Sequence, residues 1–143
     1  MRLAEELGIF FRTGQRLFRR RSVLASDRPY QQLLALRVIA RENVRTQAAL
    51  AELLVIDAPA TCRLVQRLEE DGLVIRSPGE DRRCIRLDVT PKAARELEAT
   101  DRAVDWIEEK VNRLLSPEEA RTFLELVTRL HRGLSAFDPA HDP

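Results

Sequence analysis

Apolar residues recur along this chain with a helical spacing that is interrupted once, in the middle of the sequence. From Leu3 to about Val23 they lie three and four residues apart, which predicts a helix. Asp27, as an N-cap, and Pro29, in an early turn, predict the start of a second helix that reaches about Glu42. This second helix is apolar on most sides, so we expect it to be buried.

Two shorter helices are expected next. Thr46 as N-cap predicts a helix over 47–54, and Asp57 as N-cap predicts a helix over 58–71. Gly72 is placed to close the second of these in the left-handed conformation. One side of the second helix carries a narrow apolar stripe, expected to pack on the preceding helix: Thr61, Leu64, Val65 and Leu68.

The spacing of apolar residues then changes from 3.6 to 2. Alternation over 74–77 and 83–89 predicts two strands, and the turn-rich segment 78–81 joins them. Ile85, Leu87 and Val89 are expected to point to one side of the second strand. Two short helices followed directly by a hairpin predict a winged helix-turn-helix.

Two long helices are expected after the hairpin. Thr90 and Pro91 start one that reaches about Leu115, and a capping box over 116–119, with proline at the first helical position, starts the other. Both helices carry apolar stripes at heptad spacing: Leu97, Val104, Ile107, Val111 and Leu114, with Thr100 in the remaining slot, and then Ala120, Phe123, Val127, Leu130, Leu134 and Phe137. The stripes exceed what a small winged domain covers, so we expect a homodimer, with packing inside one chain as the alternative.

The order of elements predicts a mainly α fold with a small β-hairpin, in which a winged helix-turn-helix is flanked by N- and C-terminal dimerisation helices. A length of 143 residues suits one compact body with a helical extension. By role we divide the chain into three parts. These are N-terminal helices for dimerisation and support over 1–45, a winged helix-turn-helix DNA-binding domain over 46–90, and C-terminal dimerisation helices over 91–143.

Charge is distributed unevenly although the formal net charge is only +1. Between Arg12 and Arg28 there are six arginines and one acid, whereas from Ala93 onward seven basic residues face eleven acidic ones. Such asymmetry lets one face of a protein meet an anion while another avoids it. A solvated, arginine-rich helix end is the alternative interpretation.

Several function classes are disfavoured by what the sequence lacks. It has no apolar run of about 18 residues, and acids occupy the start where an export signal needs bases, so we expect no membrane contact and a cytoplasmic protein. Cys62 and Cys84 are too few for a disulfide framework or a zinc site, so no metal or cofactor is expected. His131 and His141 are the only histidines and no catalytic set can be assembled around them, so we do not expect an enzyme.

The polar side of the 58–71 helix is the main candidate for function. It carries Pro59, Arg63, Gln66 and Glu70, flanked by Cys62 and Arg67. An arginine can grip guanine and a glutamine can grip adenine in the major groove. The hairpin adds Arg82, Arg83 and Arg86, which suit the negative potential of a minor groove. The alternatives are an ordinary amphipathic surface helix and surface ion pairs with Glu80 and Asp81.

At this point a family resemblance becomes explicit. The run TQAALAELLVIDAPATCRLVQRLEEDGLVIRSPGEDRRCIRLDVTPKA resembles the winged-helix core of the MarR (multiple antibiotic resistance regulator) family. Its most specific pieces are RLVQRLEEDGLVIR, the DRR of the wing, and VTPKA. The resemblance implies that Ala58–Asp71 is the recognition helix and that Arg82 is the minor-groove arginine at the wing tip. It also implies a homodimer on a palindromic operator, often released by small aromatic or other anionic ligands.

The chain departs from the family pattern at several places. Val55 stands where the family usually has glycine, and because a β-branched residue disfavours positive φ we expect this turn to differ locally. Ala60 and Cys62 stand where small hydroxyl residues are usual. Cys62 lies near a helix start, which raises a redox-sensing alternative, but we expect neither cysteine to be an essential switch.

Together these arguments predict a sequence-specific, duplex-DNA-binding transcription regulator, acting as a ligand-released repressor. A winged-helix module that binds protein without touching DNA is the alternative. The expected DNA-binding residues are Pro59, Ala60, Cys62, Arg63, Gln66, Arg67, Arg82, Arg83 and Arg86. By resemblance, an effector pocket would draw on Phe10, Phe11, Arg16, Tyr30 and Trp106.

Overall fold

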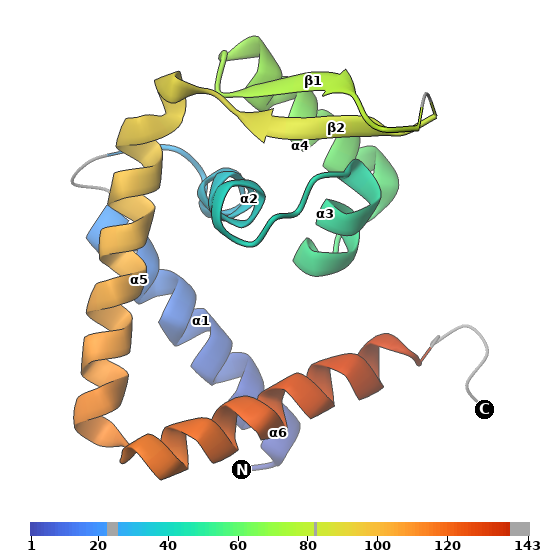
Figure 1. Ribbon diagram of the computed structural model, residues 1–143. Helices are drawn as coiled ribbons and strands as arrows, with labels where there is room; N and C mark the ends of the chain where they lie inside the picture. The colour runs from blue at the N-terminus through green and yellow to red at the C-terminus, as the bar shows by residue number, and fades with distance from the viewer. Residues whose placement is uncertain (23–25, 82, 138–143) are drawn as a thin grey trace. The chain divides into compact units, whose positions relative to one another are not determined.

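The computed structural model describes residues 1–22, 26–81 and 83–137 of the chain. Within these residues the structure consists of helices and one two-stranded antiparallel hairpin, as the sequence predicts (Figure 1). The elements are α1 (Leu3–Ser22), α2 (Tyr30–Arg41), α3 (Gln47–Leu54), α4 (Ala58–Glu70), β1 (Val74–Pro78), β2 (Ile85–Val89), a 3-10 turn (Pro91–Ala93), α5 (Ala94–Leu114) and α6 (Pro117–Ser135). The predicted fold class is therefore confirmed.

Contacts within the chain divide it into two compact units, Met1–Asp105 and Trp106–Pro143. The first unit contains α1 to α4, the hairpin and the first half of α5, and the second unit contains the rest of α5 and α6. The division by role into 1–45, 46–90 and 91–143 concerns function rather than compactness, and it stays a prediction.

The N-caps of α3 and α4 are those that the sequence predicts. The Thr46 hydroxyl accepts a hydrogen bond from the Ala49 amide at 3.1 Å, and the Asp57 carboxylate accepts one from the Ala60 amide at 2.7 Å. Each satisfies an amide that has no partner inside its helix. Gly72, with φ of 75°, ends α4 in the predicted left-handed conformation.

The core of the first unit lies where α2, α3, α4 and the hairpin meet. Thr61, Val65 and Leu68, from the predicted stripe of α4, are at most 1% exposed, and α2 is buried along most of its length, as expected. The apolar cluster comprises Ala35, Leu36, Val38, Ile39, Leu50, Val65, Leu68, Leu73, Val74, Leu87 and Ala93. Burial of this cluster holds the outer face of α4 in place, because a helix fixed on one side presents a defined opposite side.

Two predicted helix starts are wrong in detail. Asp27 is not the N-cap of α2: Pro29 occupies that position, its carbonyl accepts the Gln32 and Leu33 amides, and no side chain caps the helix. The φ of −56° at Pro29 is set by its ring and leads into the helix from the next residue, so the start moves beyond Asp27. Thr90 stands at the predicted cap, but its hydroxyl donates to the Gly72 carbonyl at 2.5 Å instead of capping.

The second strand begins later than predicted, at Ile85. Cys84 belongs to the turn rather than to the strand, because its carbonyl accepts a hydrogen bond from the Gly79 amide at 2.8 Å and its amide donates to the Asp81 carbonyl at 2.9 Å. The strands pair from Val74 opposite Val89 to Pro78 opposite Ile85. A further contact braces the hairpin from outside it, since the Leu87 amide donates to the Arg45 carbonyl at 2.7 Å.

The turn between α3 and α4 does not differ in the way that we expected from its valine. Val55 adopts φ of 55° and ψ of 49°, the left-handed conformation that glycine would favour. The Val55 amide donates to the Glu52 carbonyl and the Ile56 amide to the Ala51 carbonyl, and these hydrogen bonds stabilise the conformation. The side chain is 68% exposed and so meets no packing obstacle, but the conformation itself remains strained for a residue with Cβ.

The last helix begins with the predicted capping box. The Ser116 hydroxyl accepts the Glu119 amide at 3.2 Å, and the Glu119 carboxylate accepts the Ser116 amide at 2.8 Å. These hydrogen bonds lower the pKa of Glu119. No residue of α6 is buried, and its exposed apolar side chains are Phe123, Leu124, Leu126, Val127, Leu130 and Leu134.

Candidate nucleic-acid interface

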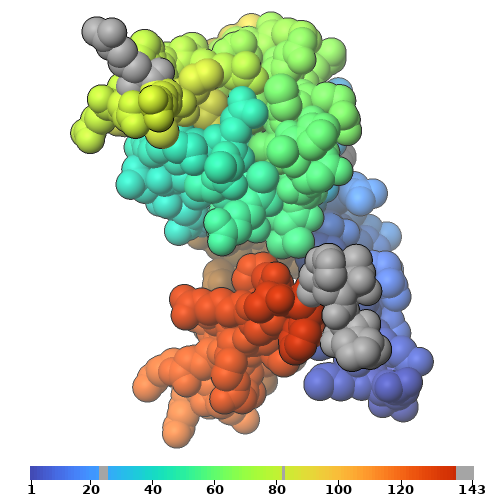
Figure 2. Space-filling model, turned by 90° about the vertical axis from the view of Figure 1, so that its right-hand side faces the viewer, coloured from blue at the N-terminus to red at the C-terminus, as the bar shows by residue number. Residues whose placement is uncertain are grey.

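The outer face of α4 presents polar side chains to solvent. Figure 2 shows α3, α4 and the hairpin side by side on one face of the first unit. Of the predicted contact residues on α4, only Ala60 is half-buried, and the others are exposed: Pro59, Cys62, Arg63, Gln66 and Arg67. The structure therefore brings this part of the predicted set together on one solvent-facing side of a helix.

The two arginines of this face differ in their surroundings. Arg63 has no ion-pair partner within residues 1–22, 26–81 and 83–137, so its guanidinium keeps its donors available. Arg67 lies 3.5 Å, Nε to Oδ2, from Asp71 one turn later on α4. Gln66 donates to Glu70 at 3.1 Å, again one turn later. Exposed pairs of this kind are weak and can be exchanged for a ligand.

The wing contributes cations of its own. Arg83 is exposed in the turn, where its amide donates to the Asp81 carboxylate at 3.2 Å. Arg86 lies on β2, and its Nε donates to the Asp88 carboxylate at 3.0 Å. Arg82 lies outside the described residues, so its role at the wing tip stays a prediction.

A further arginine at the base of the wing was missed by the sequence analysis. Arg45 donates through Nη1 to Asp88 at 2.8 Å and through Nε to Asn43 at 2.7 Å. Asp88 therefore accepts from Arg45 and Arg86 together. The sequence gives only a weak signal for this pair. Arg45 stands directly before an N-cap, and Asp88 lies 43 residues later at an outward-pointing position of β2.

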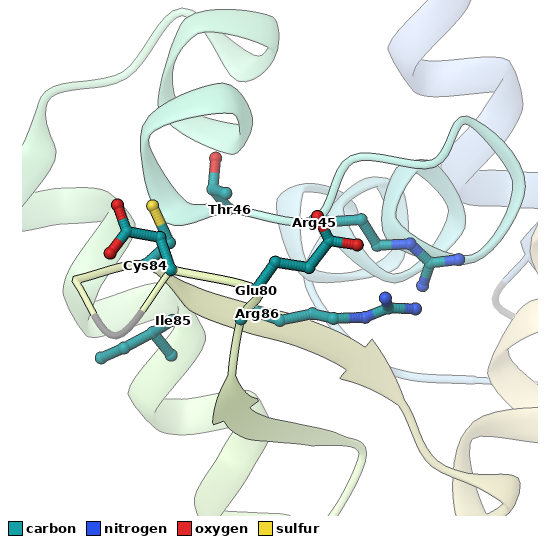
Figure 3. A pocket seen from close by; sticks show the side chains of 8 residues that line it. Arg45, Thr46, Glu80, Cys84, Ile85 and Arg86 are labelled. Carbon is teal, nitrogen blue, oxygen red and sulfur yellow. The ribbon is translucent and has the colours of Figure 1, made fainter.

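Arg45 and Arg86 border a shallow hollow of about 310 Å³ between the wing and the start of α3. Figure 3 shows Arg45 and Arg86 extending in the same direction along one side of it, with Thr46 and Cys84 nearby. The hollow is also lined by Glu80 and Asp81, so positive and negative groups nearly balance around it. The cationic character of the wing rests on arginines that are partly paired with acids.

The two cysteines are free and exposed, Cys62 on α4 and Cys84 in the wing. No group of three or more histidine, cysteine or acidic residues that could hold a metal ion occurs in the part of the chain that the structure describes. Within the same residues, no helix is long and apolar enough to cross a bilayer.

The residues predicted for an effector pocket are distributed over both units. Phe10, Phe11 and Arg16 are exposed along α1. Tyr30, at the start of α2, packs edge-on against Phe18 with ring centroids 5.0 Å apart, and burial raises its pKa. Trp106 belongs to the second unit, where the Lys110 ammonium lies 5.3 Å from the centre of its ring. The effector pocket stays a prediction.

Comparison with known proteins gives consistent results. A family model described as the MarR family matches residues 26–83. A putative transcriptional regulatory protein for the hcr operon of Thauera aromatica is 33% identical over 135 residues, which cover 91% of this chain and 81% of that protein.

Solved structures share the fold. A MepR–DNA complex from S. aureus superposes with a TM-score of 0.75 at 19% identity, over 96% of this chain and 99% of that one. Bordetella bronchiseptica BpsR, studied for regulation of its DNA binding by 6-hydroxynicotinic acid, gives a TM-score of 0.72 at 19% identity, over 96% and 95%. At such identities the likeness establishes the fold.

Proposed function

Because this chain belongs to the MarR family of transcription regulators, we propose that it binds duplex DNA in a sequence-specific manner through its winged helix-turn-helix. The family and the relative are transcription regulators rather than enzymes. The observation that carries the proposal is the outer face of α4, where Arg63 and Gln66 are exposed at adjacent turns while Thr61, Val65 and Leu68 of the opposite stripe are buried. A helix anchored in this way offers its polar side to a major groove.

In this proposal α4 and the wing have different tasks. Arg63 and Gln66 reach base edges. Two donors of an arginine match the two acceptors of guanine, and the donor and acceptor of a glutamine amide match those of adenine. Pro59, Ala60, Cys62 and Arg67 border that contact. Arg82, Arg83 and Arg86 act on the adjacent minor groove and the phosphates, through charge rather than base identity. The fold that this chain shares with a DNA-bound regulator supports the assignment.

We further propose that the regulator is a homodimer that binds a palindromic operator. The exposed apolar stripe of α6, with Phe123, Val127 and Leu130 about 40% exposed, supports this, because a monomer gains nothing from leaving such a surface in water. A two-fold axis would present two α4 helices to two half-sites about one DNA turn apart.

Release of the DNA by a small aromatic or other anionic effector completes the proposal, with the protein acting as a repressor. Support comes from the fold shared with BpsR and from aromatic and cationic residues in the predicted set, such as Phe10 and Arg16. Titration of a protein–operator complex with aromatic carboxylates tests this part. We expect the fraction of bound operator to fall as the ligand concentration rises, and the effect to saturate.

Footprinting on the DNA upstream of the protein's own gene would identify the operator, and alanine variants then test the two tasks. Arg63→Ala should cost about 1–3 kcal/mol of binding free energy and relax preference at one operator position. Arg82→Ala should weaken binding to operator and scrambled duplexes alike, and flatten the slope of log affinity against log salt by about one per lost phosphate contact. Arg102→Ala, which removes an exposed cation from α5, is the matched control for charge.

The alternative function is a winged-helix module that binds another protein. It predicts that neither Arg63→Ala nor Arg82→Ala changes DNA affinity relative to Arg102→Ala, with the fold intact in all three. That outcome would replace the DNA-binding proposal, since an exposed arginine-bearing face that ignores DNA must serve another partner.

A further inference from the structure

One arginine outside the DNA-facing surface joins three helices of the first unit. Arg28 directly precedes the N-cap of α2, and its Nη1 donates to Gln32 of α2 at 3.1 Å and to Asp71 at 2.7 Å. Its Nε lies 3.5 Å from the carboxylate of Glu96, in the first turn of α5. Asp71 is the C-cap residue of α4. A single guanidinium therefore connects the end of α4 to the beginning of α5.

Asp71 needs a cation at this position. The C-terminal end of a helix carries partial negative charge, so a carboxylate at the C-cap of α4 is unfavourable unless it is neutralised. The hydrogen bond from Arg28 is the main cause that holds the pKa of Asp71 below its usual range. Arg67, on the face of α4, lies farther from the same carboxylate, at 3.5 Å. Arg28 and Arg67 therefore share one anion.

Glu96 depends on the same guanidinium. Its side chain is only 15% exposed, and its Oε2 is buried without a hydrogen-bond partner in the described ranges 1–22, 26–81 and 83–137. A partly buried carboxylate with one unsatisfied oxygen is costly, and the cost grows when its cation is removed. Loss of Arg28 would leave Asp71 and Glu96 without their common counter-charge.

We infer that Arg28 is a positioning residue for DNA binding, although it lies off the proposed contact surface. It fastens the C-terminal end of α4 to α5, and it neutralises Asp71 so that Arg67 remains available beside the bases that Arg63 and Gln66 contact. The inference rests on the proposed DNA-binding function. It assigns Arg28 a role that acts through Asp71 and Arg67 rather than through contact with DNA.

A neighbouring pair supplies a matched control. Arg41 binds Asp101 through two hydrogen bonds of 3.2 and 2.8 Å, and Arg37 lies 3.3 Å from the same carboxylate. These pairs also tie α2 to α5, but they involve no residue of α4. Arg41→Ala therefore removes an α2–α5 ion pair of similar geometry and leaves the end of α4 unchanged.

The first experiment measures binding isotherms on operator and scrambled duplexes for Arg28→Ala, Arg28→Lys and Arg41→Ala. Arg28→Ala should weaken operator binding about three- to thirtyfold, the usual range for a residue that acts through a contact network, with little change on scrambled DNA. Arg28→Lys should restore part of the affinity, because an ammonium can still pair with Asp71. Adding Asp71→Asn to Arg28→Ala should also restore part of the affinity, because it removes the carboxylate that competes with DNA for Arg67.

The second experiment needs no DNA. Amide hydrogen exchange at Asp71, Gly72 and Leu73, which close the last turn of α4, should accelerate in Arg28→Ala and not in Arg41→Ala. Unchanged exchange, or operator affinity equal to wild type in Arg28→Ala, would overturn the inference while leaving the proposed function standing. Failure of the wild-type protein to bind any duplex would overturn the proposed function, and the exchange measurement would still report whether Arg28 fixes α4. If Arg28→Ala does not fold, Arg28→Lys carries both comparisons.

Discussion

Helices α4 and α6 are both amphipathic and both begin with a side-chain N-cap, yet their apolar sides differ in how far they are buried. In α4, Val65 and Leu68 are completely buried by α2, α3 and the hairpin of the same unit. In α6, Phe123 and Val127 remain 41% and 37% exposed. The sequence pattern of the two helices is the same in kind, so the pattern alone does not reveal what covers an apolar side.

The difference indicates which interactions each helix uses. An apolar side that is covered within its own unit stabilises the fold of that unit, and it frees the opposite polar face for recognition. The part of an apolar side that stays exposed adds nothing to stability until a further surface covers it. The difference supports the proposals that α4 reads DNA and that α6 pairs two copies of the chain, and the two proposals can be tested separately.

The largest expected effect comes from charging the exposed stripe of α6. Val127→Glu should raise the dissociation constant of the dimer at least about thirtyfold, because each dimer then buries two carboxylates that cost about 1–3 kcal/mol apiece. Arg129→Glu, on the polar side of the same helix, should leave the dimer intact. Sedimentation equilibrium at micromolar concentration measures both. A wild-type protein that sediments as a monomer would contradict the assignment of α6.

Truncating the buried stripe of α4 should have the next largest effect. Leu68→Ala should lower the free energy of unfolding by about 2–5 kcal/mol, through lost burial and the cavity that remains. Gln66→Ala, two residues away on the exposed face, should change it by less than about 0.5 kcal/mol. Urea denaturation monitored by circular dichroism measures both values. Equal losses for the two variants would mean that α4 is not anchored in the way that the structure shows.

Loss of an N-cap is expected to affect α4 and α6 alike. Asp57→Ala and Ser116→Ala should each lower the free energy of unfolding by about 1 kcal/mol, because a cap satisfies amides of its own helix whatever covers the apolar side. Asp57→Asn should cost less, since the amide oxygen still accepts the Ala60 N–H. Thermal denaturation of the three variants measures this. A cost near zero for Asp57→Ala, together with a full cost for Ser116→Ala, would show that tertiary packing makes the first cap redundant.

The smallest expected effect is a gain. Val55→Gly should raise the free energy of unfolding by about 0.5 kcal/mol. Glycine removes the Cβ clash at positive φ, and this gain exceeds the extra conformational entropy that glycine loses on folding. Val55→Ala keeps Cβ and should not produce this gain. Differential scanning calorimetry distinguishes the two. A lower melting temperature for Val55→Gly would mean that the valine makes a stabilising contact that outweighs its strain.

Features determined by residues close in sequence could be predicted. The caps at Thr46, Asp57 and Ser116 and the left-handed Gly72 follow from side chains and amides within a few positions of one another. Val55 shows the limit of this reasoning, because its own preference opposes the conformation it adopts. The hydrogen bonds that close α3 and the packing of α3 on α4 outweigh that preference.

Features that depend on distant residues were not predicted. Arg45 and Asp88 are 43 positions apart, as are Arg28 and Asp71, and no local pattern pairs them. For this reason the expected acidic partners of the wing arginines were Glu80 and Asp81, whereas Arg86 pairs with Asp88, which also binds Arg45. The exposed residues of α4 follow from helical periodicity and were predicted together. The contact of Arg28 with Asp71, which affects Arg67, comes from a distant part of the sequence, and only the folded chain shows it.

The brace between Arg45 and the wing bears on how such a regulator could be modified. The Arg45 carbonyl pairs with the Leu87 amide, and its guanidinium holds Asp88, so β2 is bordered by a second backbone segment as well as by β1. A chimera that exchanges only the hairpin 74–89 between relatives would keep an unmatched segment beside the new strand. The stretch to exchange is the longer one from Asn43 to Thr90, because it contains both partners of the Arg45–Leu87 and Arg45–Asp88 hydrogen bonds.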